Sequence, residues 1–142
     1  MKEFRRNSVY KFKFGLLWNN LKKEIIKERG NICSQCGNHN FNLILDHIIP
    51  VSMGGNEFEK NNLQLLCIDC HNIKTKQDQI NFHILKKLGF IEGFGKQIWW
   101  FYDMDEVKKS KFFPKGNKSK EQLIKENKGL IDLFLKINFG VL

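Results

Sequence analysis

The hydrophobic pattern of the chain is clearest between residues 15 and 30, where apolar side chains recur every three or four positions. This spacing is typical of an amphipathic α-helix with one apolar and one charged face. Gly30, followed by Asn31, supplies a common C-terminal signal. The apolar positions are Leu17, Trp18, Leu21, Ile25 and Ile26, and the positions predicted to point outward are Lys22, Lys23, Lys27 and Arg29.

After residue 40 the pattern changes from helical spacing to alternation, which is typical of a half-buried strand. Pro50 ends the alternating run, and Gly89 closes a later apolar-periodic segment. Strand, loop, strand and helix follow one another and predict a compact ββα unit in an α+β chain. The predicted elements are a strand over 41–49, a turn at 54–56, a second strand over 62–66 and a helix over 68–88.

The segments on either side of this unit are basic. Residues 1–14 mix lysine and arginine with aromatic residues and predict an irregular arm, while residues 108–128 carry eight lysines against two acids and predict a mobile segment. Residues 90–102 predict a turn and then a short buried strand or helix start, and the apolar spacing over 123–137 predicts a final amphipathic helix. The predicted division is 1–30, 31–89 and 90–142, packed as one compact domain.

Net charge narrows the choice of partner. The chain of 142 residues carries a formal charge of +9, which indicates a polyanion, either nucleic acid or an anionic membrane, unless the charge only keeps a basic surface soluble. No apolar run is long enough to cross a membrane and the first residues do not form a secretory signal, so we expect a cytoplasmic protein. The candidate DNA contacts are Arg5, Arg6, Lys22, Lys23 and Lys74, although Lys74 is equally well explained as a solvated lysine.

All four cysteines fall into two Cys-x-x-Cys pairs, Cys33 with Cys36 and Cys67 with Cys70. In a reducing compartment two such pairs indicate a metal knuckle rather than disulfides, and four thiolates are the ligand set of a structural tetrahedral Zn²⁺. The alternatives are a redox pair or unmetallated thiols. His39 could replace one cysteine, but with four thiols present it is more simply an ordinary loop histidine.

Asp46 and His47 end the first predicted strand, so their side chains leave the strand on opposite sides. His71 directly follows Cys70 and projects about 100° around the helix from it, toward the predicted hairpin. Asp46 and His71 together would leave most of an octahedral shell open, which suits Mg²⁺ or another divalent ion acting on a phosphate. A lone Asp-His pair would more simply be a structural histidine held by its neighbour.

Two further features have two interpretations each. Asn62 precedes the second strand, where its amide could hydrogen-bond across the loop and fix the strand end that carries His47, or Asn61-Asn62 could be an ordinary turn. The run of aromatic residues from Trp99 to Tyr102 could stack on bases, although four consecutive aromatic residues are more often part of a core.

The order CSQC, LDHIIP, GG, NNLQLLCIDCH over residues 31–76 resembles the zinc-containing HNH endonucleases. The resemblance implies a ββα-metal fold and hydrolysis of DNA with one divalent ion, leaving 5′-phosphate and 3′-hydroxyl ends. It implies that His47 is the general base, Asn62 the middle residue of the motif, and Asp46 and His71 the ligands of the catalytic ion. A third ligand found in some members would fall at Thr75, so two protein ligands are expected here.

Two classes of function compete. The completeness of the Asp46, His47, Asn62 and His71 set favours a metal-dependent endonuclease over a zinc-stabilised nucleic-acid-binding module without catalysis. Enzymes of restriction, homing and phage genome processing all use the HNH unit. The sequence does not distinguish a restriction-type enzyme from a phage or homing nicking enzyme. The final apolar helix either pairs with a second copy in a homodimer or packs on its own domain.

Overall fold

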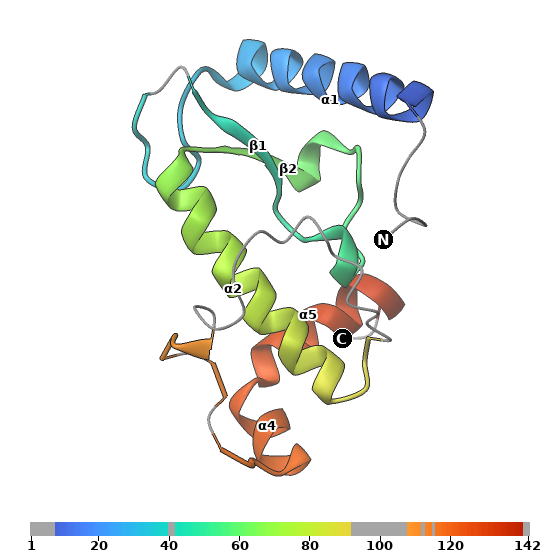
Figure 1. The fold of residues 1–142 in the computed structure, drawn as a ribbon, viewed down its shortest axis with the longest axis vertical. Helices are drawn as coiled ribbons and strands as arrows, with labels where there is room; N and C mark the ends of the chain where they lie inside the picture. Colours follow the sequence, from blue (N-terminus) through green and yellow to red (C-terminus); the bar gives the residue numbers. More distant parts are fainter. Residues whose placement is uncertain (1–7, 40–41, 92–107, 112, 115, 141–142) are drawn as a thin grey trace. The chain divides into compact units, whose positions relative to one another are not determined.

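The computed structural model describes residues 8–39, 42–91, 108–111, 113–114 and 116–140 (Figure 1). Within them the chain forms helices, short 3-10 turns and one two-stranded antiparallel sheet, which confirms the predicted α+β class. Arg5, Arg6, Phe41 and the aromatic run at 99–102 lie outside these residues, as does most of the element predicted over 90–102. The elements are α1 (Ser8–Arg29), β1 (Ile44–His47), η2 (Val51–Met53), η3 (Lys60–Asn62), β2 (Leu63–Leu66), α2 (Ile68–Lys87), α4 (Lys120–Glu126) and α5 (Lys128–Phe139).

The chain divides into two compact units. Unit 1 comprises residues 1–48 and 56–71, and unit 2 comprises residues 49–55 and 72–142. Unit 1 contains α1, the β1–β2 hairpin and the first residues of α2, while unit 2 contains the rest of α2 with α4 and α5. The helix α2 is therefore continuous along the chain from one unit into the other.

Helix α1 begins at Ser8, so the prediction of an irregular arm over 1–14 is wrong from Ser8 onward. No proline interrupts residues 8–29, and one internal glycine, Gly15, costs a helix only about 1 kcal/mol relative to alanine. The end of the helix is where the sequence predicts it. Gly30 adopts a positive φ of 85° and donates its backbone N–H to the Ile26 carbonyl at 2.7 Å.

The hairpin holds the catalytic candidates. β1 and β2 are antiparallel, with Ile44 opposite Leu66 and His47 opposite Leu63. β1 is shorter than the strand predicted over 41–49, because the chain turns away after His47 into Pro50 and η2. The hairpin connection continues past the strand end, where Ile48 donates its N–H to the Asn62 carbonyl at 2.8 Å.

The core of unit 1 is built by one face of α1 and the inner face of the hairpin. Each fully buried leucine or isoleucine contributes roughly 1.5–3 kcal/mol relative to an exposed one. Trp18, Ile26 and Phe58 pack at the edge of this core and are only partly buried. The buried residues are Leu21, Ile25, Cys33, Leu43, Leu45, Leu63, Leu65 and Leu66.

Unit 2 contradicts part of the prediction for residues 108–128, because residues 120–126 form α4 rather than a mobile segment. Ser119 starts this helix, since its Oγ accepts a hydrogen bond from the Gln122 N–H at 3.1 Å. Asn127 separates α4 from α5, which corresponds to the predicted final helix. The core of unit 2 comprises Met53, Leu85, Ile131 and Phe134, with a neighbouring cluster of Ile80 and Ile84.

The turn predicted at 54–56 favours glycine at its first position. Gly54 has a φ of 95°, which residues with a Cβ rarely adopt, and a Cβ there would also displace the side-chain amide of Asn138. The Asn138 amide also donates to the Met53 carbonyl at 3.0 Å, so this close approach ties the turn to α5 inside unit 2.

Within the described residues, no helix has the length and apolar character that crossing a membrane requires.

Candidate active site and zinc site

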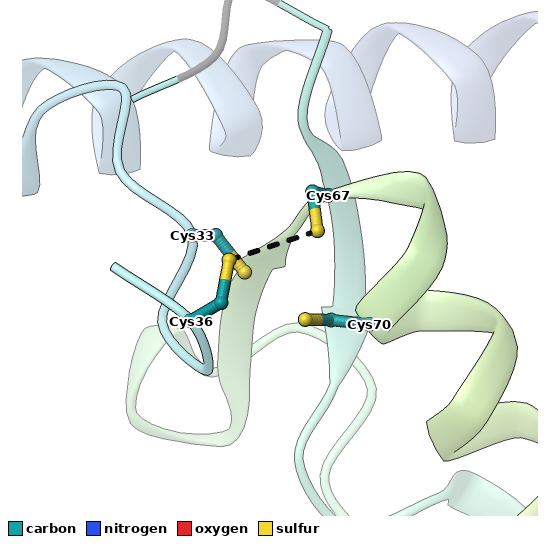
Figure 2. A group of neighbouring side chains, drawn as sticks. All are labelled: Cys33, Cys36, Cys67 and Cys70. Atoms are coloured by element: carbon teal, nitrogen blue, oxygen red, sulfur yellow. Dashed lines mark hydrogen bonds between the residues drawn. The ribbon is translucent and has the colours of Figure 1, made fainter. Parts of the chain in front are cut away.

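The four cysteines come together in unit 1, and Figure 2 shows their sulfurs pointing toward one another. Cys33 and Cys36 lie on the knuckle that follows α1, while Cys67 and Cys70 lie at the end of β2 and the start of α2. The knuckle is folded by its own backbone, since Gly37 donates to the Cys33 carbonyl at 2.9 Å. It is also tied to β2 by the Ser34 N–H, which donates to the Leu65 carbonyl at 2.8 Å.

The sulfur positions fit a tetrahedral Zn²⁺. All four Sγ atoms lie within 4.8 Å of one another, and Cys36 Sγ is 3.9 Å from Cys67 Sγ. Zn–S bonds of about 2.3 Å in a tetrahedron place sulfurs about 3.8 Å apart. The four-thiol donor set and this spacing therefore support the predicted structural zinc, and His39 is not a member of the cluster.

The protein environment prepares this site for a cation. Burial opposes ionisation of Cys33, but the backbone N–H groups of Cys36, Cys67 and Gln35 lower the pKa of its thiol to about 6. Hydrogen bonding with Cys67 raises the pKa of Cys70 to about 12. Only a positive ion would make four neighbouring thiolates stable together, so binding of zinc here is coupled to release of protons.

A second pair of candidate ligands lies beside the zinc knuckle. Asp46 leaves β1 toward the first turns of α2, where His71 Nε2 is 4.0 Å from Asp46 Oδ1. Two ligand atoms that each lie about 2.1 Å from one ion are at most about 4.2 Å apart. The pair therefore fits a shared divalent ion, and both side chains are largely buried, with 20% of Asp46 and 26% of His71 exposed.

The side chain of His47 points away from this pair. Its Nε2 is 2.9 Å from the Glu57 carbonyl oxygen, and its ring lies 5.1 Å from the ring of Trp18, centroid to centroid. A carbonyl oxygen only accepts hydrogen bonds, so Nε2 carries the proton. In the neutral ring the lone pair is then on Nδ1, which is the state that a general base requires.

Asn62 organises the loop that supplies the Glu57 carbonyl. Its side-chain Nδ2 donates to the Asn56 carbonyl at 2.7 Å, across the base of the loop. Asn56 Oδ1 in turn accepts the backbone N–H groups of Phe58 and Glu59, each at 3.0 Å. These bonds fix the loop so that the Glu57 carbonyl oxygen lies within hydrogen-bonding distance of the His47 imidazole.

Side chains of helix α1 contact the end of the same loop, at Lys60 and Leu63. The Arg29 guanidinium donates to the carbonyls of Leu63 and Lys60, both at 2.8 Å. Lys60 Nζ lies 2.7 Å from Glu28 and 2.9 Å from Glu24, which lowers the pKa of Glu28 through their hydrogen bond. The prediction that Arg29 only points outward is therefore incomplete, because its exposed side chain binds the backbone on both sides of Asn62.

Comparison with protein-family models gives one match over this part of the chain. The model described as HNH endonuclease matches residues 33–77, which include both cysteine pairs, both catalytic candidates on β1, Asn62 and His71. This HNH segment is similar to the HNH endonuclease family. Comparison with curated proteins and with solved structures gave no match.

Three residues that support the HNH segment did not stand out in the sequence. Trp18 and Arg29 precede the segment and follow the helical pattern of α1, so the periodicity assigned one to the core and the other to solvent. The sequence predicts only a turn at Asn56. The available signal was the clustering of asparagines at 56 and 62, since asparagine side chains often hydrogen-bond the backbone of a loop.

The candidate DNA contacts that the structure describes differ in environment. Lys23 is exposed on α1 and Lys22 is half-buried on the same helix. Lys74 Nζ lies 2.5 Å from Asp78, one turn along α2, and this ion pair lowers the net charge that Lys74 offers to a phosphate. DNA binding by these lysines stays a prediction.

Replacing Arg29 by alanine is expected to destabilise unit 1 by about 1–3 kcal/mol, because two carbonyls beside Asn62 lose a charged hydrogen-bond donor. Equilibrium unfolding in urea measures this change. Lys27→Ala is the matched control, since Lys27 is exposed on the same helical turn. An equal loss in both variants would contradict a specific role for Arg29 in bracing the HNH segment.

Proposed function

We propose that the protein is a metal-dependent DNA endonuclease. The observation that carries the proposal is the placement of the three polar side chains around β1 and α2. Asp46 faces His71 at 4.0 Å, while His47 is fixed on the Glu57 carbonyl with its Nδ1 as the basic nitrogen. An inert binding module needs a zinc knuckle and basic charge, but it has no use for this second set.

The proposed reaction is hydrolysis of one phosphodiester bond. His47 Nδ1 removes a proton from a water molecule as the water oxygen forms a bond to phosphorus. The bond between phosphorus and the 3′ oxygen breaks, and that oxygen takes up a proton from solvent. The products are a 5′-phosphate and a 3′-hydroxyl, and His47 returns its proton to solvent before the next cycle.

Asp46 and His71 are the residues that would hold the divalent ion, with Mg²⁺ as the expected metal. When bound, such an ion supplies Lewis-acid stabilisation of the negative charge that develops on phosphate oxygens. Asp46 contributes the hard oxygen ligand that Mg²⁺ prefers. Asn62 acts through the loop, since its hydrogen bond to Asn56 keeps the Glu57 carbonyl in place for His47.

DNA is the proposed substrate because both units carry excess positive charge. Residues 1–30 contain nine basic residues against three acidic ones. In unit 2, burial and then the charges of Lys87, Lys108 and Lys86 lower the pKa of His83, which indicates that these lysines gather around it. Such clusters neutralise phosphates and make affinity fall steeply with salt. A single HNH segment cuts one strand at a time, so a double-strand cut requires two copies or two visits.

A plasmid assay tests the proposal. The purified zinc-bound protein is expected to convert supercoiled plasmid to the nicked form with Mg²⁺ and to leave it intact with EDTA, while a mobility-shift assay reports DNA binding separately. DNA binding without nicking across a range of divalent ions and DNA sequences would favour the binding-module alternative. Sequencing of the cut ends then distinguishes a restriction-type enzyme from a phage or homing nicking enzyme.

Asp46→Asn is expected to raise the Mg²⁺ concentration for half-maximal cleavage at least about tenfold, because even residues outside a metal's ligand shell change affinity by about 10–100-fold. The titration of cleavage rate against Mg²⁺ measures this shift. Asp69→Asn is the matched control, since Asp69 is exposed in the first turn of α2. An unchanged Mg²⁺ requirement in Asp46→Asn would remove Asp46 from the ion site.

A further inference from the structure

The imidazole of His47 is held by two elements that are distant in sequence. The first contact is the hydrogen bond from Nε2 to the carbonyl of Glu57, at 2.9 Å, in the loop between β1 and β2. The second contact is with the Trp18 ring of α1, whose centroid lies 5.1 Å from the imidazole centroid with an angle of 43° between the ring planes. This separation is within the range of direct aromatic contact.

One hydrogen bond does not fix the direction of the other ring nitrogen. A histidine side chain rotates about two bonds, and small rotations that keep Nε2 near the carbonyl still swing Nδ1 through space. Contact with a large ring removes much of that freedom, because the imidazole cannot move into the volume of the indole. Trp18 therefore restrains the atom that is proposed to take the proton.

Trp18 is suited to this task because the helix that carries it is anchored within unit 1. Leu21 and Ile25, one and two turns further along α1, are 9% and 0% exposed in the core. At its other end α1 is tied to η3 by Arg29 and by Glu24 and Glu28 through Lys60. A restraint from this helix is therefore fixed relative to the loop that carries Glu57.

We propose that Trp18 is a positioning residue for the general base, so that α1, which precedes the family segment, is part of the catalytic apparatus. The inference rests on the proposed nuclease function. Displacing a catalytic group by about 1 Å can cost roughly 100-fold in rate. Loss of one of two restraints on His47 is expected to lower kcat by about 10-fold or more.

The test compares Trp18→Leu, Trp18→Phe and Ile26→Ala in the zinc-bound protein with Mg²⁺ and plasmid DNA. Trp18→Leu is expected to lower kcat by about 10- to 100-fold with KM within about twofold. Trp18→Phe keeps an aromatic ring and is expected to restore most of the rate. Ile26→Ala removes a side chain that packs against the same core, so it controls for a loss of stability alone.

A double-mutant cycle asks whether the effect passes through His47. In the His47→Ala background, measured by single-turnover cleavage, Trp18→Leu is expected to have no further effect, because the group that it positions is absent. Additive losses, a normal kcat in Trp18→Leu, or a raised KM with unchanged kcat would each overturn the inference. The last result would make Trp18 a DNA contact instead.

A spectroscopic measurement separates this inference from the nuclease proposal. In proton NMR, the ring protons of His47 feel the ring current of Trp18, so their shifts are expected to change in Trp18→Leu and to change little in Ile26→Ala. If the wild type cuts DNA but these shifts do not respond to Trp18→Leu, the positioning role is wrong. If the shifts respond and the wild type does not cut, the contact is real and the proposed function fails.

Discussion

Replacing His47 by alanine is expected to lower the rate of DNA cleavage by about 10²- to 10⁴-fold, the range that a general base contributes. His47 Nε2 donates to the Glu57 carbonyl, so Nδ1 is the only ring nitrogen that can accept a proton from water. Asp46 and His71 are untouched by the substitution and would still hold the divalent ion. The variant is therefore expected to bind DNA and Mg²⁺ normally and to cut slowly, as measured by single-turnover cleavage.

Two further variants sharpen this prediction. His47→Gln places an amide N–H where it can still donate to Glu57, but it has no basic nitrogen, so it is expected to be as slow as His47→Ala. His39→Ala is the matched control, because His39 is an exposed histidine of the same unit outside the cysteine cluster. Cleavage by His47→Gln at the wild-type rate would show that His47 braces the loop and does not act as a base.

The sequence predicts the centre of the site because its chemistry depends on short spacings. Two Cys-x-x-Cys pairs predict the zinc knuckle, and the structure brings the four sulfurs together as expected. Asp46 and His47 are adjacent on a strand, so alternation alone sends their side chains in opposite directions. The antiparallel hairpin and the helix after it follow from the turn and the periodicity between residues 41 and 88.

The surroundings of the site were not predictable in the same way, because they depend on contacts between distant segments. Nothing in the local sequence of α1 indicates that Trp18 lies on His47 or that Arg29 binds the carbonyls beside Asn62. The sequence does not predict α4, because the lysines of this helix and the nearby Pro114 are typical of a mobile segment. Its formation depends on a capping serine and on Leu123, which is 1% exposed.

Removal of the zinc is expected to have a still larger effect, namely loss of the folded state of unit 1. In the part of this unit that the structure describes, the core has eight buried residues and a sheet of two strands, one of them followed directly by Cys67. Small domains are stable by only about 5–15 kcal/mol, while a structural zinc contributes about 10–16 kcal/mol of binding free energy. Without zinc the sulfur links from the knuckle to Cys67 and Cys70 are lost, and the hydrogen bond from Ser34 to Leu65 remains as a tie between the knuckle and β2.

Cys70→Ser tests this directly, because Cys70 is a sulfur of the cluster and hydrogen-bonds Cys67. Bound metal is measured by elemental analysis, with one zinc per chain expected in the wild type and little in the variant. The variant is expected to lose both the cooperative thermal unfolding transition of the folded protein and DNA cleavage. Excess Mg²⁺ is not expected to restore either one, because Mg²⁺ disfavours thiolate ligands. Ser34→Ala, an exposed change in the same knuckle, is expected to keep both. A Cys70→Ser protein that lacks zinc yet unfolds cooperatively at the wild-type temperature would show that the hairpin core is stable by itself, and the four thiols would then need another role.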